Sequence, residues 1–442
     1  MKKAVLSNRI YLHAEGSFAK ELLDKLTYII PGKHPKEKPF YQRNASRVTD
    51  SLVSIPIGRE DLIPEGYEVV DKRIEVPVDF PEFRFTLRDS QREIYEKVEP
   101  GLSIINADPA WGKTFTGLAI VGKLGQKALI ITHTIALRDQ WVQEIEKVYG
   151  FKPSVIGSSE FDTSKPITVG NIQTLYNCID RIVATFGTVV LDEMHHVSAR
   201  TFSGVVDKLK AKNKIGLSAT LERKDGKHIM FPDYFGYKIY KAEGENSLEP
   251  RVDFIISDIP FNDSPGVSWA EKVNELCSNE EYFYLCLFLA EAYRKQGHKV
   301  IALGDRVDFS NAAAEILEDS SVAITGQVKE LEERTRLLNK IRSGEKGILW
   351  GSRSIFSEGI SENSLSCLIM TTPISKNPSA MEQIIGRITR KQDGKKNPVI
   401  VDIALQGGQA YGQSRSRLDF YASKGWKVRF IDFADVGEKF RP

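Results

Sequence analysis

The sequence predicts an α/β protein in which two parallel-sheet units stand in tandem after a small α+β domain. Short apolar stretches typical of strands alternate with helical patterns from about residue 104 to residue 240, and the same alternation restarts after about residue 275. The chain of 442 residues also exceeds the size at which a single hydrophobic core stops growing. We therefore expect a small α+β domain at residues 1–78, a first parallel-sheet domain at 79–245 and a second at 246–442.

The N-terminal part has its own short strand signals, at residues 4–12 and 51–57. Between them, the stretch from Lys33 to Arg43 mixes basic and aromatic side chains. Such a mixture occurs both in solvated loops and in segments that contact nucleic acid, and both interpretations stay open. Farther along, the polar stretch 243–250 ends in a proline and predicts a domain boundary.

The composition is that of a soluble globular protein, with 41% hydrophobic and 27% charged residues. The net charge of +2 does not exclude a nucleic-acid partner, because a basic groove can be balanced by acidic faces elsewhere. No apolar run approaches a membrane span and the first residues lack the apolar centre of a signal peptide, so we expect a cytoplasmic protein. We expect buried, reduced thiols at Cys178, Cys277, Cys286 and Cys367.

The first strand of the first parallel unit leads into a loop that predicts phosphate binding. The loop reads Ala-Asp-Pro-Ala-Trp-Gly-Lys-Thr over residues 107–114, and helix-compatible residues follow it. Gly112 allows the tight turn that aims backbone N–H groups at phosphate oxygens. Lys113 can then reach the β- and γ-phosphates, and the Thr114 hydroxyl can ligate Mg²⁺. The loop therefore indicates a nucleoside triphosphate bound together with Mg²⁺.

Two acidic residues follow the apolar strand at residues 188–191. Ligands bind at the carboxyl ends of parallel strands, so Asp192 and Glu193 are placed to act on the same nucleotide. Asp192 can hold the Mg²⁺ that bridges the β- and γ-phosphates, while Glu193 can orient and deprotonate the attacking water. Together with the phosphate loop, this acidic pair favours an enzyme that hydrolyses the triphosphate.

The order of four motifs resembles the first motor domain of the superfamily 2 helicases. Leu-Arg-x-x-Gln at residues 87–91 precedes the phosphate loop, and Asp-Glu-x-His at 192–195 and Ser-Ala-Thr at 218–220 follow it. The resemblance implies RecA-like domains and ATP as the nucleotide, with Gln91 reading the adenine edge. It also implies that Ser218 and Thr220 couple the nucleotide state to domain movement. The residues that it places around ATP are Leu87, Arg88, Gln91, Pro109, Ala110, Trp111, Gly112, Lys113, Thr114, Phe115 and Gly359.

The second unit carries the last motif of the same family. Gln-Ile-Ile-Gly-Arg-Ile-Thr-Arg at residues 383–390 matches the family pattern Gln-x-x-Gly-Arg-x-x-Arg. A guanidinium group holds a permanent charge in a planar fork that suits phosphate oxygens. The resemblance therefore implies that Gln383, Arg387 and Arg390 complete the ATP site when the two domains close. Just upstream, residues 351–361 resemble the family motif that touches both the nucleotide and the strand backbone.

Further features resemble DNA translocases, and among these the phage branch-migration helicases of the UvsW type. They are the segment 132–141, the stretch 223–226 and the phrase Phe-Ser-x-Gly-Ile-Ser at 356–361. The resemblance implies a monomeric, ATP-dependent helicase in the host cytoplasm that unwinds or branch-migrates forks, Holliday junctions and displacement loops in recombination, replication or repair. The implied contacts to the nucleic-acid backbone, independent of base sequence, are Thr134, Arg138, Gln173, Thr174, Arg306, Thr325, Gly326 and Ser352.

Two alternatives stay open. An RNA helicase would carry the same ATP motifs, and a nucleotide-switched module would bind ATP and nucleic acid without unwinding. The presence of Glu193 and Arg387 argues against the module, because both residues serve hydrolysis.

Overall fold

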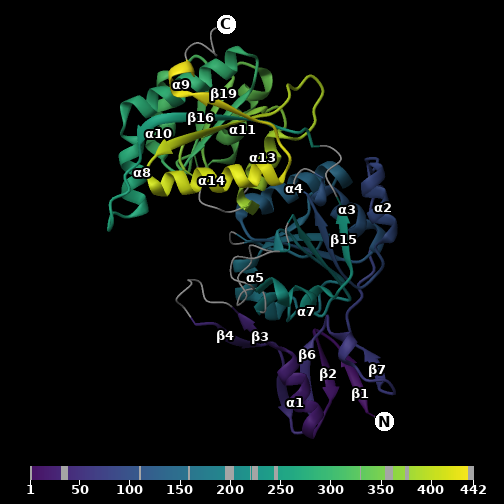
Figure 1. Cartoon of the computed structure of the whole chain (residues 1–442). Helices are drawn as coiled ribbons and strands as arrows, with labels where there is room; N and C mark the ends of the chain where they lie inside the picture. Colours follow the sequence, from purple (N-terminus) through teal and green to yellow (C-terminus); the bar gives the residue numbers. More distant parts are fainter. Residues whose placement is uncertain are drawn as a thin grey trace. The chain divides into compact units, whose positions relative to one another are not determined.

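The structure is a computed structural model that describes residues 2–30, 38–108, 111–157, 160–194, 204–219, 221, 227–242, 247–328, 330–353, 362–373 and 378–436. The chain divides into two compact units, Met1–Glu245 and Asn246–Pro442 (Figure 1). Each unit contains a large parallel sheet, so the predicted α/β class is confirmed. None of the helices in the described part of the chain combines the length and apolar character that a membrane crossing requires.

A five-stranded sheet forms the N-terminal part of the first unit. Its elements are β1 (Lys3–Leu6), β2 (Arg9–His13), α1 (Gly16–Lys25), β5 (Ser46–Thr49), β6 (Leu52–Pro56), the 3-10 helix η1 (Glu60–Leu62) and β7 (Glu68–Asp71). The strand order is β5-β6-β2-β1-β7, antiparallel except for the parallel pair β1 and β7. The single strand signal at 4–12 is two strands in the structure, because the chain reverses at Ser7 and Asn8.

A two-stranded antiparallel ribbon, separate from this sheet, consists of β3 (Thr27–Ile30) and β4 (Phe40–Arg43). β4 contains the end of the basic and aromatic stretch Lys33–Arg43. Residues 31–37 of that region lie outside the described residues.

The first parallel sheet has eight strands. They are β8 (Leu102–Ala107), β9 (Ala128–Thr132), β10 (Ser154–Gly157), β11 (Glu160–Phe161), β12 (Ile167–Asn171), β13 (Thr188–Leu191), β14 (Asn213–Ser218) and β15 (Ile239–Ala242). Their order is β11-β10-β12-β9-β13-β14-β8-β15, and all neighbours are parallel except β10 and β11. β13 coincides with the apolar strand expected at residues 188–191, whereas β10, β11 and β15 were not predicted.

Helices cover both faces of this sheet. They are α2 (Asp89–Lys97), α3 (Lys113–Leu124), α4 (Ile135–Tyr149), α5 (Ile172–Cys178), η2 (Ile179–Arg181), η4 (Lys227–Met230) and α7 (Phe231–Phe235). Successive side chains of a strand point to opposite faces. Accordingly, Ile105 packs in one core cluster with α2, α3 and α4, while its neighbour Ile104 packs in the other with α5 and α7.

The second unit is built on a seven-stranded sheet in which every neighbouring pair is parallel. The strands are β16 (Arg251–Pro260), β17 (Val300–Gly304), β18 (Ser321–Ile324), β19 (Ile348–Ser352), β20 (Cys367–Met370), β21 (Val399–Gln406) and β22 (Val428–Asp432), in the order β18-β19-β17-β20-β21-β16-β22. The helices are α8 (Trp269–Cys277), α9 (Glu280–Lys295), α10 (Val307–Ile316), α11 (Leu331–Ser343), α13 (Pro378–Ile388), α14 (Gly408–Ser423) and η5 (Phe433–Asp435).

The cysteines differ in part from the prediction. All four are free, but only Cys286 and Cys367 are buried, whereas Cys178 and Cys277 are half-buried. Cys178 lies at the last residue of α5 and Cys277 at the last residue of α8, and a helix end exposes more of its surface than a central strand does.

A buried carboxylate ties the N-terminal part to the first parallel sheet. The side chain of Asp233 in α7 is 1% exposed and accepts hydrogen bonds from the Tyr28 hydroxyl at 2.8 Å and the Asn44 amide at 2.7 Å. Burial raises the pKa of Asp233, and these donors partly offset the effect. The backbones also meet here, because Gly58 N–H donates to the Asp233 carbonyl at 2.8 Å and a Cβ on Gly58 would lie 1.9 Å from the Pro232 carbonyl oxygen.

A second buried charge lies in the sheet itself. Lys214 in β14 is fully buried, and its Nζ donates to the Val206 carbonyl at 2.9 Å. Burial lowers the pKa of Lys214 to about 8. The unfolded chain, in which lysine titrates near 10.4, therefore binds this proton more tightly than the folded protein between these two pH values, and stability rises with pH across that window.

We predict that Lys214→Met raises the free energy of unfolding at pH 7 by about 2 kcal/mol, from roughly 3 kcal/mol of relieved charge burial less about 1 kcal/mol for the lost hydrogen bond. The difference from the wild type should shrink as pH increases from about 8 to about 10, because the wild-type lysine then becomes neutral in the fold. Urea unfolding at several pH values measures this difference in the free energy of unfolding. Lys208→Met, at an exposed lysine, is the control, and a difference independent of pH would contradict the prediction.

Candidate functional site

The predicted site residues of the first unit follow the carboxyl ends of its strands. The phosphate loop begins after β8, Thr134 comes after β9, Gln173 comes after β12, Asp192 directly follows β13, and Ser218 ends β14. Because these strands are parallel, all of their carboxyl ends lie at one edge of the sheet.

The second sheet has the same arrangement. Arg306 follows β17, Thr325 and Gly326 follow β18, and Ser352 is the last residue of β19. The helix α13, with Arg387, comes after β20. Each unit therefore gathers its own predicted residues at a single sheet edge.

The phosphate loop is shaped by a glycine with a left-handed backbone. Gly112 has φ +95°, and a Cβ at this position would lie 2.6 Å from Nε2 of Gln91. Gly112 also precedes the first residue of α3, whose amino-terminal N–H groups form a ready anion site. Lys113 is 9% exposed, and its Nζ donates to the Ala107 carbonyl at 3.0 Å. Pro109 and Ala110 lie outside the described residues.

The side chain of Gln91 holds the phosphate loop in place by hydrogen bonds. Its side chain is buried, Oε1 accepts from Arg88 N–H at 3.0 Å, and Nε2 donates to the Trp111 carbonyl at 2.9 Å. The Arg88 guanidinium donates to the same carbonyl, and the Trp111 indole donates to Ser90 Oγ at 3.1 Å. Each end of the Gln91 amide keeps one further hydrogen-bonding position, so the predicted contact to adenine remains compatible with this geometry.

Leu87 and Phe115 flank the same region and are half-buried. The Phe115 ring packs edge-on against Phe83 and Phe85, with ring centroids 5.0 and 5.5 Å away. Thr114, in the first turn of α3, is also half-buried. The roles assigned to these three residues stay predictions.

Asp192 is a buried carboxylate with two protein donors. Its side chain is 4% exposed, the indole Nε1 of Trp141 donates to Oδ2 at 2.8 Å, and Glu193 N–H donates to Oδ1 at 2.9 Å. Burial raises the pKa of Asp192 above its usual range, and the neighbouring Glu193 carboxylate raises it further, while Trp141 and the Lys113 ammonium lower it. The ionised form of Asp192 is therefore disfavoured, because the surrounding protein groups compensate its charge only in part.

Trp141 is a residue that sequence reasoning did not assign to the site. It lies in the quoted segment 132–141, but its contact to Asp192 spans fifty-one positions of the chain. A tryptophan inside an amphipathic helix gives no local signal of such a partner, so only the packing of α4 against the sheet identifies it.

The turn after β13 is strained and anchored. Glu193 has φ +45°, the only positive φ at a non-glycine residue in the described part of the chain. Sparsely populated backbone conformations of this kind cluster at functional sites. The next side chain, Met194, is fully buried beside Gly216, where a Cβ would lie 2.5 Å from the Met194 sulfur. His195 and the residues up to 203 lie outside the described part.

The donor set fits Mg²⁺ held together with a triphosphate. Asp192 and Thr114 offer the hard oxygen ligands that Mg²⁺ prefers, and burial leaves the charge of Asp192 only partly offset by the nearby Lys113 ammonium. In the described residues no three His, Cys, Asp or Glu side chains cluster around a common point. Mg²⁺ sites in nucleotide enzymes use one or two protein ligands and complete the shell with phosphates and water.

The residues predicted to touch nucleic acid have unlike surroundings in the first unit. Thr134 caps α4, its hydroxyl accepting from Leu137 N–H at 3.2 Å. The Arg138 guanidinium is ion-paired with Asp139 at 2.7 Å. Gln173 is exposed and Thr174 is half-buried.

In the second unit, the Arg306 guanidinium donates to the Ala270 carbonyl at 2.8 Å, so it is held against α8. Thr325 and Ser352 are buried, whereas Gly326 is exposed. These placements leave the nucleic-acid contacts as predictions.

The last motif lies on and just beyond α13. Gln383 and Arg387 are one helical turn apart, and the Gln383 side chain lies outside the described residues. The Arg390 guanidinium donates to Asn363 Oδ1 at 3.0 Å. Residues 354–361, including the predicted nucleotide contact Gly359, and the predicted coupling residue Thr220 also lie outside the described part.

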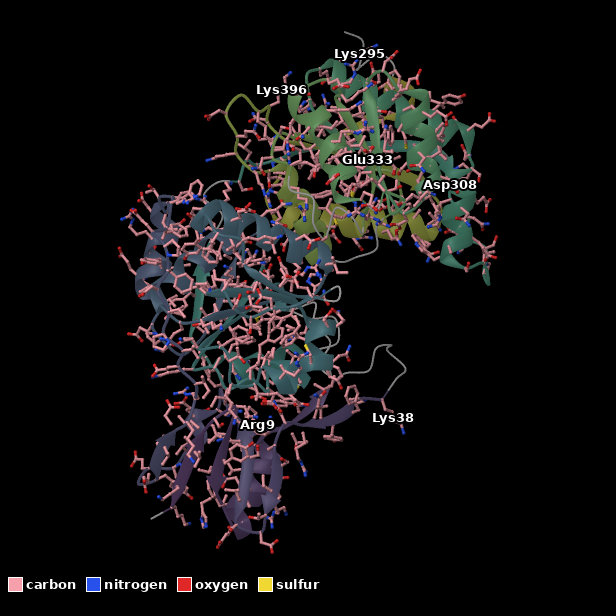
Figure 2. All side chains as sticks on the ribbon, turned by 180° about the vertical axis from the view of Figure 1, so that it is seen from behind. Arg9, Lys38, Lys295, Asp308, Glu333 and Lys396 are labelled. Carbon is pink, nitrogen blue, oxygen red and sulfur yellow. The ribbon has the colours of Figure 1, made fainter. Side chains whose placement is uncertain are left out.

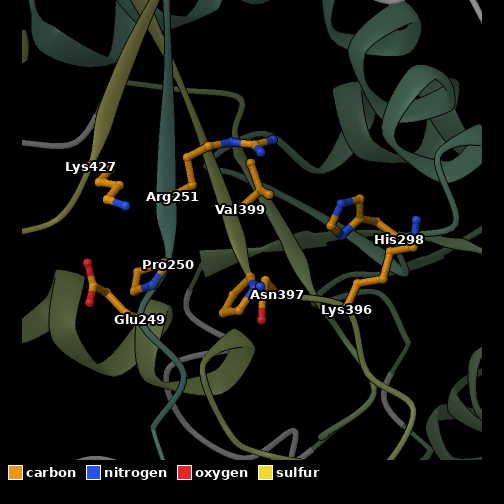
Figure 3. A pocket seen from close by; sticks show the side chains of 9 residues that line it. Glu249, Pro250, Arg251, His298, Lys396, Asn397, Val399 and Lys427 are labelled. Carbon is orange, nitrogen blue, oxygen red and sulfur yellow. The ribbon is translucent and has the colours of Figure 1, made fainter.

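A pocket of about 470 Å³ opens at the opposite edge of the second sheet, where the strands begin (Figure 3). Its lining comes from the segments that precede β17, β21 and β22 and from the start of β16: Glu249, Pro250, Arg251, His298, Lys396, Asn397, Pro398, Val399 and Lys427. Burial lowers the pKa of His298 to about 4, and the Lys396 and Arg251 cations add to this, so the imidazole is neutral at pH 7. No residue predicted for ATP or nucleic acid lines this pocket.

Two parallel sheets in tandem, with a phosphate loop and an acidic strand end at one edge of the first, define the class of P-loop nucleotide-binding proteins. Within this class, two protein-family models match parts of the chain. "Type III restriction enzyme, res subunit" matches residues 84–223, and "Helicase conserved C-terminal domain" matches residues 282–392.

The chain belongs to the superfamily 2 helicases, as the motifs predicted. It is 37% identical over 433 residues to the "Probable helicase D10" of Escherichia phage T5, across 96% of this chain and 95% of that protein. It is also 24% identical over 408 residues to the DNA 3'-5' translocase XPB2 of Sulfurisphaera tokodaii, across 81% of this chain and 91% of that one. As a helicase of this superfamily, the protein is an ATP-dependent enzyme that acts on nucleic acid.

The chain is also similar to solved structures of helicases. The Saccharomyces cerevisiae Dbp5 structure, bound to RNA and ADP BeF3, matches with a TM-score of 0.56 and 14% identity, over 80% of this chain and 91% of that one. The crystal structure of T4 UvsW matches over 98% of this chain and 99% of that one, with a TM-score of 0.42 and 18% identity. The Dbp5 likeness confirms the predicted RecA-like domains.

We predict that Trp141→Phe raises the Mg²⁺ concentration for half-maximal ATPase by roughly tenfold, because removal of a partner that orients a metal-binding carboxylate typically costs that much or more. A Mg²⁺ titration of ATP hydrolysis measures the effect. Trp350→Phe is the matched control, since Trp350 is fully buried in β19 and its Nε1 has no hydrogen-bond partner among the described residues. Equal Mg²⁺ dependence in both variants would contradict a role for Trp141.

Proposed function

We propose that the protein is an ATP-dependent DNA helicase or translocase that unwinds or branch-migrates forked and junction DNA. It works as a monomer in the host cytoplasm during recombination, replication or repair. The buried Asp192 carboxylate near Lys113, at the carboxyl edge of a parallel sheet, carries the ATPase part of the proposal. The similarity to a protein named as a DNA translocase supports DNA as the substrate.

Within this proposal the first motor domain, residues 79–245, binds and cleaves ATP. Lys113 and the N–H groups at the start of α3 bind the phosphates, while Gln91 keeps the loop in shape and contacts adenine. Asp192 and Thr114 hold Mg²⁺, which when bound neutralises the charge that develops on the phosphate oxygens. Glu193 takes a proton from the attacking water.

The second motor domain, residues 246–442, completes the reaction. Arg387 and Arg390 supply fixed positive charge to the γ-phosphate, and Gln383 and Gly359 contact the nucleotide or its water. Ser218 and Thr220 pass the nucleotide state to the domain movement. Residues 1–78 contribute to binding of the branched substrate. The strand backbone runs past the two carboxyl edges and is held without regard to base sequence by Thr134, Arg138, Gln173, Thr174, Arg306, Thr325, Gly326 and Ser352.

We predict that Lys113→Ala lowers DNA-stimulated ATPase by roughly a hundredfold or more, because a preorganised positive charge on the phosphates is lost. DNA binding without ATP should stay close to wild type. Lys123→Ala is the control, since Lys123 lies on the same helix and its Nζ donates to the Val98 carbonyl at 2.9 Å instead. Stimulated hydrolysis by Lys113→Ala at the wild-type rate would overturn the assignment of the loop.

RNA is the second candidate substrate, because the same fold is bound to RNA in the Dbp5 structure. We expect ATPase stimulation to be greatest with forked or four-way DNA, smaller with linear duplex and smallest with structured RNA. Steady-state ATPase on this panel, with gel analysis of the strands produced, measures the preference. Equal or greater stimulation by RNA would exclude the DNA proposal, and nucleotide binding without turnover would indicate a switch module.

A further inference from the structure

The β3–β4 ribbon has two unlike faces. In an antiparallel ribbon, directly opposite residues share a face and successive residues alternate between faces. Tyr28 and Ile30 therefore lie on one face, and Ile29 lies on the other, opposite Tyr41. Ile30 is fully buried, whereas the exposed fractions of Ile29 and Tyr41 are 59% and 73%. Large apolar side chains gathered on an exposed face mark an interaction site more often than isolated ones do.

The inner face of the ribbon is fixed to the first motor domain. The Tyr28 hydroxyl lies 2.8 and 2.9 Å from the two carboxylate oxygens of Asp233, and the ring packs against a core cluster of the first parallel sheet. Just after β4, the Asn44 amide donates to the same carboxylate. Because this face is held by buried contacts, the outer face presents Tyr41 without the entropic cost of ordering a flexible loop.

The chemistry of the outer face fits a polyanion with flat apolar groups. Arg43 shares the face of Tyr41 and is exposed, and its Nε donates to Thr27 Oγ1 at 3.0 Å, which orients the guanidinium. Lys38 is exposed at the far end of the ribbon (Figure 2). Neither strand contains an acidic residue, since β3 reads Thr-Tyr-Ile-Ile and β4 reads Phe-Tyr-Gln-Arg. An aromatic ring flanked by cations is the pattern that binds unpaired bases with their phosphates.

We infer that the outer face of this ribbon is a stacking platform for an unpaired base of the nucleic acid on which the helicase acts. The Tyr41 ring stacks on the base, Ile29 supports the ring from the opposite strand, and Arg43 and Lys38 contact adjacent phosphates. This inference rests on the proposed function and deepens it, because it places single-stranded nucleic acid on the N-terminal part. Stacking does not depend on base identity, so the platform serves strands of any sequence.

The test uses the full-length protein and a single-stranded oligonucleotide that carries a fluorescent adenine analogue, without ATP. We expect Tyr41→Ala to weaken binding by roughly fivefold to a hundredfold, the range for loss of one stacked base, and Tyr41→Trp to preserve it. The analogue should be quenched by the wild type and by Tyr41→Trp, but not by Tyr41→Ala or Tyr41→Leu. Tyr411→Ala, at a tyrosine 66% exposed on α14, is the matched control.

The charged part of the platform has its own measurement. Arg43→Gln should lower the slope of log affinity against log salt by about one, as expected for loss of one phosphate contact. Because Tyr41 and Arg43 are exposed, the variants should retain the wild-type thermal midpoint, which shows that they fold.

Two outcomes would overturn the inference that the ribbon is a stacking platform. One is Tyr41→Ala binding and quenching the oligonucleotide as the wild type does. The other is wild-type self-association that Tyr41→Ala abolishes while nucleic-acid binding is unchanged, which would make the face a protein contact. The ATPase of the wild type separates this inference from the proposed function. If the wild type shows no stimulated ATPase, the proposed function fails, but the quenching measurement still tests the platform.

Discussion

Parallel pairing of the strands is the constraint on which both units depend. Because parallel strands begin at one edge of a sheet and end at the other, every loop after a strand opens at the same edge. The loop after β8 and the acids after β13 thus meet, although the two strands are not neighbours in the sequence or in the sheet. The requirement is that both faces of the sheet be covered, so β9 and β13 consist entirely of buried residues. Lys214 lies in such a strand, β14, where a backbone carbonyl accepts a hydrogen bond from its Nζ.

The acidic strand end illustrates how this constraint produces chemistry. A carboxylate in water is ionised at neutral pH, but Asp192 is buried after β13, where burial disfavours its charge. Among the described residues, the donors to Asp192 are one indole and one backbone N–H, both neutral, and nearby Lys113 supplies positive charge. The same burial that disfavours the charge on Asp192 would favour a bound cation at this carboxylate. The left-handed backbone at Glu193 sets the direction in which the Glu193 side chain leaves the turn.

The central strands could be predicted because a strand buried on both faces is a continuous apolar run. β13 has the bounds that the apolar pattern indicated, and Asp192 and Glu193 follow it directly. β22, at the edge of the second sheet, was missed because exposed residues such as Phe430 blur its pattern. The contacts that complete the site could not be predicted, since Trp141 with Asp192 and Tyr28 with Asp233 join distant parts of the chain. No local propensity encodes which buried donor will reach which buried acceptor.

The hydrogen bonds to Asp233 determine which parallel sheet the β3–β4 ribbon stays attached to. Moving the ribbon away would leave this buried carboxylate without the Tyr28 and Asn44 donors, and an unsatisfied buried acceptor costs a few kcal/mol. The backbone contact at Gly58 adds to that cost, because the two backbone segments touch there without side chains between them. The ribbon therefore stays with the sheet that carries the phosphate loop. If ATP hydrolysis moves one motor domain against the other, a base held on Tyr41 keeps its position relative to the loop, and the second unit performs the displacement.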